Sequence, residues 1–418
     1  MRLILRPYQH AYISKLPARA ILAADTGTGK TFMALAHYER YGANKPLLVI
    51  APASKVNTGD WERDIDLYFE GRENARPQEI YIMSYEKLAR NPSAKKWTEG
   101  ARPVWHKFYH LAGAGNLALI ADECHKAKNP QSGVGKATFE IASRCGCVSL
   151  LSATPISNGW KDAANYFKIF GFTKNKTSFW RRYVVEDRSR GFPIILGYWH
   201  EDELTRLWQS ISFGLKKTAL EGMPTQEFIG VDFKKPTDYG KILVTRTDPR
   251  TGDPVESPSR LASILRQSLT TKQKLDFLSD LLDGTNENVV IFYNYISERE
   301  AILSMLKKEH RDKQVFRQDG EKHELPNKVD WDNITNSVTL AHFKSGSTGV
   351  EMTYASLTVY FSPTYSYQEY IQSVGRTYRS GQAKPCVYYC FRTKGSLEQD
   401  CWNCLSRKED FSEKMLRL

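Results

Sequence analysis

The chain has 418 residues, of which 41% are hydrophobic and 25% are charged. This length suits two or three globular domains, and the composition excludes a fibrous or wholly disordered protein. Lys and Arg number 59 against 47 Asp and Glu, which gives a net charge of +12. Such an excess favours a polyanionic partner, and nucleic acid is a better candidate than a membrane surface.

The sequence has no apolar run near the roughly 18 residues of a membrane span, and its first residues do not resemble a signal peptide. Its 7 cysteines are an odd number at low density, unlike the disulfide framework of an extracellular domain. We therefore expect a soluble protein without a membrane partner, located in the cytoplasm of a bacterium or of an infected host cell.

Short apolar runs recur along the chain and suit strands of parallel sheets that are covered on both faces. These runs are 20–24, 47–51, 80–83, 117–121 and 148–151 in the first part, and 289–293, 338–341, 357–361 and 387–391 in the last. Between them are helix-like segments such as 31–41, 136–143, 297–308 and 367–378. The alternation predicts two α/β units.

We predict an α/β fold with two parallel-sheet lobes in tandem, residues 1–165 and 271–418. The region between them, residues 166–270, lacks the regular alternation. It contains aromatic and basic helical stretches such as 179–182 and a turn-rich piece at 247–254. We interpret it as a mainly helical insertion and linker.

The first apolar run leads into a glycine-rich loop, residues 24–31, which matches the phosphate-binding loop except that Ala24 replaces its first glycine. In such a loop, backbone N–H groups and the N-terminus of the next helix face the phosphates. Lys30 would contact the β and γ phosphates, and the Thr31 hydroxyl would coordinate Mg²⁺. The expected nucleotide-binding residues here are Thr26, Gly27, Thr28, Gly29, Lys30 and Thr31.

Two carboxylates, Asp122 and Glu123, follow the fourth apolar run, at the edge of the sheet where α/β folds place ligands. We expect Asp122 to hold Mg²⁺ and Glu123 to orient and deprotonate the attacking water. Such a pair alone also solvates strand ends or caps helices, but the upstream loop favours the catalytic interpretation. Ser-Ala-Thr-Pro at 152–155 closes the next run and is, by itself, compatible with a plain turn.

Arg376 and Arg379 are spaced i, i+3, which places them on one face of a helix. Planar, permanently charged guanidinium groups can stabilise charge on a transferring phosphoryl group. From this segment alone, surface ion pairs or contacts with a nucleic-acid backbone are equally compatible with the spacing.

Taken in order, these motifs resemble the superfamily 2 helicases and translocases, most closely the Snf2 family, over nearly the whole chain. The resembling segments are Leu5–Gln9 for adenine reading, Ile50–Ser54 with Trp61 and Glu62 for motif Ia, Ile82–Glu86 for motif Ib, Asp122–His125 for motif II, Lys126–Pro130 for its Snf2-type continuation, Ser152–Asn158 for motif III, Val290–Phe292 for motif IV, Ser345–Met352 for motif V, and Gln372–Gln382 for motif VI.

Some positions depart from the Snf2 pattern. Four departures look more like general helicases. They are the motif I sequence Asp-Thr-Gly-Thr at 25–28, Cys124 in motif II, Ser-Ala-Thr in motif III, and the absence of a double glycine in motif V. They leave the ATPase assignment intact, because the phosphate-contacting lysine, the acidic pair and both arginines are present. The departures weaken the inference of duplex translocation, so strand separation is kept as an alternative activity.

The resemblance implies two RecA-like lobes whose interface binds Mg-ATP, so that hydrolysis opens and closes the cleft and moves the protein along nucleic acid. The implied catalytic residues are Lys30, Glu123, Arg376 and Arg379. Beyond the residues above, the implied ATP contacts are Gln9 and Gly349. The implied coupling residues are His125, Ser152, Thr154 and Gln372.

Movement along a nucleic-acid backbone needs phosphate contacts from both lobes. The expected contacts are Ala53, Ser54, Lys55, Ser84, Lys126, Lys128, Ser345, Gly346 and Thr348. Four basic pairs, at 181–182, 216–217, 234–235 and 307–308, either line a nucleic-acid channel or are solvated surface.

Two further features have an ordinary interpretation that we prefer. Cys386, Cys390, Cys401 and Cys404 have a spacing compatible with zinc, but a strand and a helix are usual core settings for free cysteines. The aromatic stretch 167–180 either stacks on bases or, more commonly at helical spacing, builds a core.

The main hypothesis is a nucleic-acid-stimulated ATPase that moves along double-stranded DNA, in a minimal bacterial or viral form without room for a histone-reading domain. The first alternative is a strand-separating DNA helicase, with the aromatic stretch as a pin. Less favoured are an ATP-switched DNA clamp without sustained turnover and an RNA-directed motor.

Overall fold

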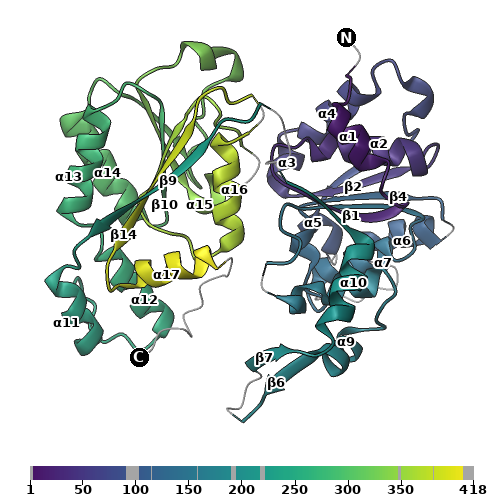
Figure 1. The fold of residues 1–418 in the computed structure, drawn as a ribbon, viewed down its shortest axis with the longest axis horizontal. Helices are drawn as coiled ribbons and strands as arrows, with labels where there is room; N and C mark the ends of the chain where they lie inside the picture. The colour runs from purple at the N-terminus through teal and green to yellow at the C-terminus, as the bar shows by residue number, and fades with distance from the viewer. Residues whose placement is uncertain are drawn as a thin grey trace. The chain divides into compact units, whose positions relative to one another are not determined.

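The computed structural model describes residues 3–90, 103–113, 115–157, 159–189, 194–216, 222–346, 350–379 and 381–407. The chain forms two compact units, Met1–Glu221 and Gly222–Leu418, each built around its own sheet (Figure 1). Within the described ranges, no helix combines the length and apolarity needed to cross a membrane.

The sheet of unit 1 has six parallel strands in the order β3-β2-β4-β5-β1-β8. Its strands are β1 (Arg19–Ala24), β2 (Leu47–Ala51), β3 (Ile80–Ser84), β4 (Ala118–Asp122), β5 (Cys147–Leu151) and β8 (Ser212–Leu215). Every residue of β2, β4 and β5 is buried, as expected for apolar runs in a sheet that is covered on both faces.

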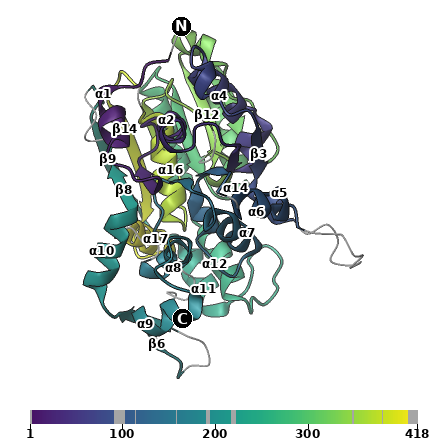
Figure 2. The same cartoon turned by 90° about the vertical axis from the view of Figure 1, so that its right-hand side faces the viewer.

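Helices cover both faces of this sheet and enclose two separate cores (Figures 1 and 2). One face carries α1 (Pro7–Ile13), α2 (Lys30–Tyr41) and α4 (Asp60–Phe69). The other carries α5 (Tyr85–Ala89), α6 (Trp105–Gly113), α7 (Gly133–Ala142) and α8 (Ala164–Ile169). Short pieces α3 (Ala53–Asn57), η1 (Glu73–Ala75), η2 (Cys124–Ala127) and η3 (Trp160–Ala163) connect them.

The last part of unit 1, from α9 to β8, leads the chain back to the sheet of this unit. Helix α9 (Lys176–Tyr183), the antiparallel hairpin of β6 (Val184–Asp187) and β7 (Ile194–Tyr198), and α10 (Glu201–Ile211) lead into β8. Strand β8 pairs with β1, and the Asp25 N–H donates to the Leu215 carbonyl at 2.9 Å. The strand that carries the glycine-rich loop is therefore paired on both sides.

The sheet of unit 2 also has six parallel strands, in the order β11-β12-β10-β13-β14-β9. Its strands are β9 (Gln226–Phe233), β10 (Val289–Tyr293), β11 (Gln314–Gln318), β12 (Ser337–His342), β13 (Leu357–Tyr360) and β14 (Cys386–Thr393). One face carries α13 (Lys272–Asp283) and α14 (Ile296–Glu309), and the other carries α15 (Phe343–Gly346) and α16 (Tyr367–Thr377).

Three helices of unit 2, α11 (Thr237–Thr245), α12 (Pro258–Gln267) and α17 (Leu397–Ser406), share a small core of their own. The short helix η5 (Lys328–Asn333) precedes β12. The predicted α/β fold with two parallel-sheet lobes is confirmed. Residues 166–270 are divided between the units, because β8 completes the first sheet and β9 completes the second.

A fully buried ion pair joins two helices of unit 2. Lys274 Nζ of α13 lies 2.6 Å from Glu398 Oε1 of α17, and the two side chains are 1% and 0% exposed. The other oxygen of Glu398 accepts hydrogen bonds from the Thr393 N–H at 3.2 Å and from its hydroxyl at 2.8 Å. The pair therefore fixes α13 and α17 to the end of β14.

A buried histidine connects α2 to β5. His37 Nε2 lies 2.8 Å from the Pro17 carbonyl, and Nδ1 lies 2.8 Å from the Ser149 hydroxyl. A carbonyl only accepts, so Nε2 carries the proton and Nδ1 accepts from Ser149. Burial lowers the pKa of His37, and the imidazole is neutral in the folded protein.

We expect His37 to make the protein less stable in acid. Its folded pKa is below its unfolded value of about 6.5, so its contribution is complete above that pH and declines as the pH falls. The free energy of unfolding, measured in urea from pH 5 to 8, should fall more in wild type than in His37→Gln. Gln has one donor and one acceptor for the same partners but does not titrate, and equal slopes for the two proteins would contradict the prediction.

All seven cysteines are buried and free, and burial raises the pKa of the Cys145 and Cys147 thiols to about 12. Among the described residues, no group of three or more His, Cys, Asp or Glu side chains is placed to hold a metal ion. In the aromatic stretch, Phe167 and Phe179 are fully buried in the core of unit 1, and Phe170, Phe172 and Trp180 are half-buried against it.

Candidate active site

The glycine-rich loop connects β1 to α2 and has the backbone of a phosphate cradle. Gly27 and Gly29 have φ angles of 83° and 80°, a left-handed conformation that only glycine adopts without strain. Helix α2 begins at Lys30, whose Nζ donates to the Ala24 carbonyl at 2.6 Å. The loop therefore folds around the lysine ammonium, with the positive end of a 12-residue helix behind it.

Helix α1 supports this loop from outside. Gln9 Nε2 and the Tyr8 hydroxyl both donate to the Thr28 carbonyl, each at 3.1 Å. The Gln9 Oε1 atom accepts from the Arg6 N–H at 2.9 Å, so the amide is oriented from both ends. A Cβ atom at Gly29 would overlap the Gln9 amide. Gln9, which the resemblance assigns to adenine, is thus packed against the phosphate loop.

The acidic pair follows β4 in the same unit. Asp122 is buried, and its Oδ2 accepts from Lys55 Nζ at 2.6 Å and from Trp61 Nε1 at 3.2 Å. Glu123 is also buried and has a positive φ of 52°. For a residue with a Cβ this conformation is uncommon, and such residues are enriched at functional sites.

Lys30 and the acidic pair lie within electrostatic range of one another. Burial lowers the pKa of Lys30, and Glu123 and Asp122 oppose this shift. A glycine cradle, a helix N-terminus and a buried lysine fit a polyphosphate. The Thr31 hydroxyl in the first turn of α2 and the Asp122 carboxylate are oxygen ligands of the kind that Mg²⁺ prefers. The residues present therefore fit a magnesium nucleotide.

Three of the predicted coupling residues, His125, Ser152 and Thr154, are connected by hydrogen bonds. His125 Nδ1 lies 3.0 Å from the Ser152 hydroxyl and 3.4 Å from Glu123 Oε2. Ser152 Oγ also accepts from the Thr154 N–H at 3.1 Å. Burial lowers the pKa of His125 to about 4, so a neutral imidazole joins the acidic pair to the end of β5.

The residues of unit 1 that we expect to contact nucleic acid differ in exposure and in the partners they already have. Lys55 is paired with Asp122, and Lys128 Nζ lies 2.8 Å from the buried Asp162. Lys126 is more exposed and lies 3.6 Å from Glu86. Ser84 caps α5, and Ala53 and Ser54 begin α3. All three lysines therefore have an acidic partner within the unit, and Lys126 is the most exposed of them.

In unit 2, the two predicted arginines do not share a helix. Arg376 lies in α16, is buried, and donates to the Val350 carbonyl at 2.8 Å. Helix α16 ends at Thr377, so the expectation of a single helical face is wrong. Arg379 Nε instead lies 3.5 Å from Glu351, which also pairs with Lys328.

The remaining predicted residues of unit 2 lie near this segment. Gln372 is buried in α16, and Ser345 and Gly346 are in α15. Thr348 and Gly349 lie outside the described residues.

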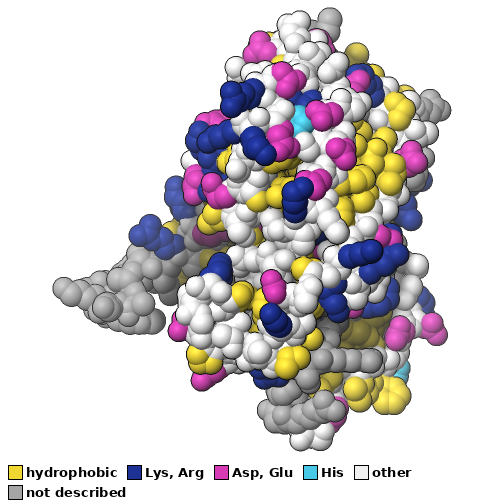
Figure 3. Space-filling model, turned by 90° about the vertical axis from the view of Figure 1, so that its left-hand side faces the viewer, with side chains coloured by type: hydrophobic (Ala, Val, Ile, Leu, Met, Phe, Trp, Pro, Cys, Tyr) yellow, Lys and Arg dark blue, Asp and Glu magenta, His cyan; other side chains and the backbone are white. Residues whose placement is uncertain are grey.

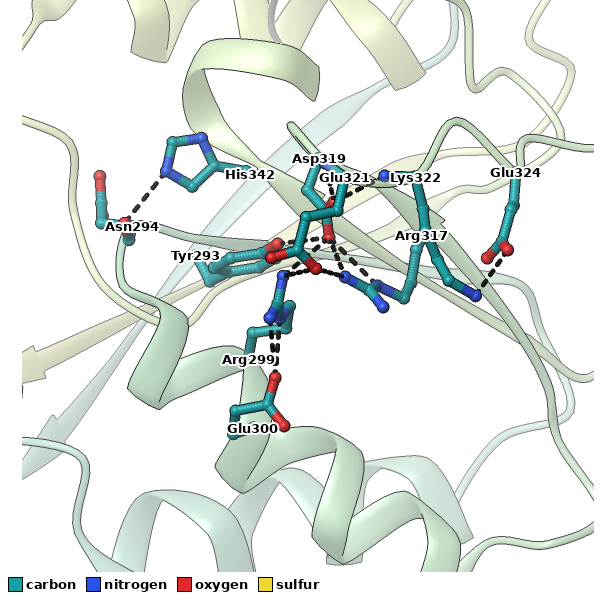
Figure 4. A network of polar contacts seen from close by, with 10 residues as sticks. All are labelled: Tyr293, Asn294, Arg299, Glu300, Arg317, Asp319, Glu321, Lys322, Glu324 and His342. Carbon is teal, nitrogen blue, oxygen red and sulfur yellow. Dashed lines mark hydrogen bonds and ion pairs between the residues drawn. The ribbon is translucent and has the colours of Figure 1, made fainter.

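A polar network that we did not predict lies at the carboxyl ends of β10, β11 and β12 (Figure 4). Asp319 Oδ2 accepts from Arg317 Nη2 at 2.8 Å and from the Tyr293 hydroxyl at 3.1 Å, and Arg299 Nη1 lies 3.4 Å away. Burial would raise the pKa of Asp319, but these bonds and those from the Glu321 and Lys322 N–H groups hold it well below its usual value. The turn after β11 is therefore fixed by a charged carboxylate.

Two family models match the chain. The model described as the type III restriction enzyme res subunit matches residues 2–173, and the helicase conserved C-terminal domain matches residues 273–381. An uncharacterized ATP-dependent helicase of Mycoplasma genitalium is 23% identical over 95% of this chain. The ISWI chromatin-remodeling complex ATPase ISW1 of Saccharomyces cerevisiae is 24% identical over 94% of it. The chain is similar, over both units, to Snf2-like superfamily 2 helicases.

One of the two family models matches within each unit, and the two parallel-sheet units have the fold of tandem RecA-like lobes. A third relative, the SWI/SNF-related matrix-associated actin-dependent regulator of chromatin subfamily A-like protein 1 of Xenopus tropicalis, is 22% identical over 93% of the chain. The chain spans 40%, 39% and 42% of the length of these three relatives. The first matched region contains Lys30, Asp122 and Glu123, and the second contains Arg376 and Arg379.

Gly29→Ala should weaken nucleotide binding by this protein. The loop of the variant escapes a strain of about 1–2 kcal/mol by leaving the left-handed conformation, and regaining the phosphate cradle on binding then lowers the affinity by roughly 5- to 30-fold. The Cβ atom would also displace the Gln9 amide. Binding of a fluorescent ADP measures the effect. Gly59→Ala is the control, because Gly59 has a φ of 66° and open space around its Cβ position. An equal loss in both variants would contradict the role of the Gln9 contact.

Proposed function

We propose that the chain is a nucleic-acid-stimulated ATPase that moves along double-stranded DNA. The observation that carries the proposal is the arrangement in unit 1 of Lys30, Asp122 and Glu123, with His125 connecting the acidic pair to Ser152. The motor-type names of the relatives and the basic net charge support a nucleic-acid partner.

In this proposal, each residue has a role that its chemistry suits. Lys30 lies against the β and γ phosphates, and Thr31 and Asp122 hold Mg²⁺, which supplies charge neutralisation at the phosphates. Glu123 orients the attacking water and accepts its proton. Arg376 and Arg379 of unit 2 supply positive charge to the transferring phosphoryl group.

The proposed nucleic-acid contact is with the backbone and is spread over several residues. On the face drawn in Figure 3, Lys and Arg side chains form several separate groups with Asp and Glu between them. The net charge is therefore not gathered in one patch on that face. Contacts with backbone phosphates position a protein on nucleic acid without reading the bases.

Strand separation has less support than duplex translocation. The aromatic stretch expected as a pin contributes Phe167 and Phe179 to the core of unit 1, where neither can reach a base. A strand-separating helicase, an RNA-directed motor and an ATP-switched clamp remain as outcomes of the functional test.

The test is steady-state ATP hydrolysis without nucleic acid and with single-stranded DNA, duplex DNA or RNA. Strong stimulation by duplex DNA supports the proposal. Preference for single strands, with unwinding of forked duplexes, would support the helicase, and preference for RNA would support an RNA motor. Binding of ATP and DNA without hydrolysis would favour the clamp.

A further inference from the structure

The contact between Lys55 and Asp122 joins two parts of the proposed motor. Lys55 lies in α3, among the expected phosphate contacts, and Asp122 is the expected magnesium ligand. Their Nζ and Oδ2 atoms are 2.6 Å apart, and the side chains are 24% and 3% exposed. The Trp61 indole N–H donates to the same oxygen at 3.2 Å. The buried carboxylate is thus neutralised and oriented by two groups of the motif Ia segment.

This carboxylate needs a counter-ion. An ionised carboxylate buried without one is strongly disfavoured, and the Trp61 indole supplies a hydrogen bond but no charge. Lys55 supplies the counter-ion here. Mg²⁺ at Asp122 would repel an ammonium at this distance, so the lysine and the metal ion compete for the carboxylate.

The lysine is able to leave. About a quarter of its side chain is exposed, and α3 has only five residues with no buried side chain among them. By contrast, the side chains of the Lys274–Glu398 pair are 1% and 0% exposed. An ammonium released from Asp122 can reach solvent at α3, where a phosphate of a nucleic-acid backbone is a suitable new partner.

We propose that Lys55 is a positioning residue that links nucleic-acid binding to metal binding. Its ammonium holds Asp122 in place before the magnesium nucleotide binds, and it moves to a backbone phosphate when Mg²⁺ takes over the carboxylate. Nucleic acid that attracts Lys55 thereby raises the affinity of Asp122 for the metal, and linkage requires the reverse effect as well. This inference rests on the proposed nucleic-acid-dependent ATPase.

The test measures metal binding instead of turnover. Mn²⁺ replaces Mg²⁺, and electron paramagnetic resonance of free Mn²⁺ gives its affinity for the ADP-bound protein, with and without a short DNA duplex. We expect Lys55→Met to bind Mn²⁺ more tightly than wild type, by about 5- to 150-fold for a coupling of this kind. The duplex should tighten Mn²⁺ binding to wild type and have little effect on the variant.

Three further proteins sharpen the result. Lys55→Arg keeps a competing cation and should resemble wild type, and Lys55→Gln removes the charge but keeps a hydrogen bond if the methionine variant folds poorly. Lys136→Met removes an exposed lysine of α7 and should leave both quantities unchanged.

Equal or weaker Mn²⁺ affinity in the uncharged Lys55 variants, or an undiminished duplex effect, would overturn the inference. Fluorescent ADP binding without metal separates this from failure of the proposed function. If ADP binds all the proteins, only the role of Lys55 has failed. If ADP binds none of them, the nucleotide site itself is wrong and the inference falls with it.

Discussion

Replacing Glu123 by glutamine should lower kcat for ATP hydrolysis by about 100- to 10,000-fold, the usual contribution of a general base. Glutamine has nearly the same shape but cannot accept the proton of the attacking water. Lys30, Thr31 and Asp122 are unchanged, so nucleotide binding should be retained. Steady-state hydrolysis with saturating nucleic acid and fluorescent ADP binding measure the two quantities.

The control for this variant is Glu201→Gln. Glu201 is exposed in the first turn of α10, also in unit 1, so removing its charge should alter kcat only slightly. Near-normal turnover by Glu123→Gln would mean that another group accepts the proton. Loss of ADP binding would mean that Glu123 supports the fold of the site, in keeping with its positive φ.

Lys274→Met should destabilise unit 2 by about 3–5 kcal/mol, the cost of leaving one partner of a buried ion pair alone. Glu398 would keep its hydrogen bonds from Thr393 but would be charged and without a counter-ion. The free energy of unfolding in urea measures the loss. The double variant Lys274→Met/Glu398→Gln should recover much of it, because no buried charge is left unpaired.

A matched control lies in the same helix. Lys272 pairs with Asp276 at 2.8 Å, but the side chains are 87% and 55% exposed, so Lys272→Met should change the free energy of unfolding only slightly. Similar losses for the two lysine variants would show that burial of the Lys274 pair has little effect on stability.

The fold was predictable where strands are continuous apolar runs. Nine such runs correspond to β1 to β5, β10 and β12 to β14. Strands β8 and β9 were not predicted, because β8 has four residues and β9 is a largely exposed edge strand. Their assignment to different sheets depends on pairing with β1 and β14, which local periodicity does not contain.

The site residues could be predicted where the residues of a motif are close together in the sequence. The spacing of the glycines and Lys30 and the adjacent Asp122 and Glu123 are visible in a few residues of sequence. The pairing of Lys55 with Asp122 spans 67 positions, and that of Lys128 with Asp162 spans 34. No spacing rule identifies such pairs. For the same reason, the Asp319 network was not predicted, since its arginines come from different elements.

Because every thiol is buried, the reactivity of the cysteines reports how often the structure around them opens. Cys124, Cys145 and Cys147 are in unit 1, and the other four cysteines are in unit 2. A thiol that is both inaccessible and protonated reacts only when its surroundings unfold. The rate of alkylation at each cysteine, followed by mass spectrometry, would therefore measure the opening rate of each unit separately in the wild-type protein.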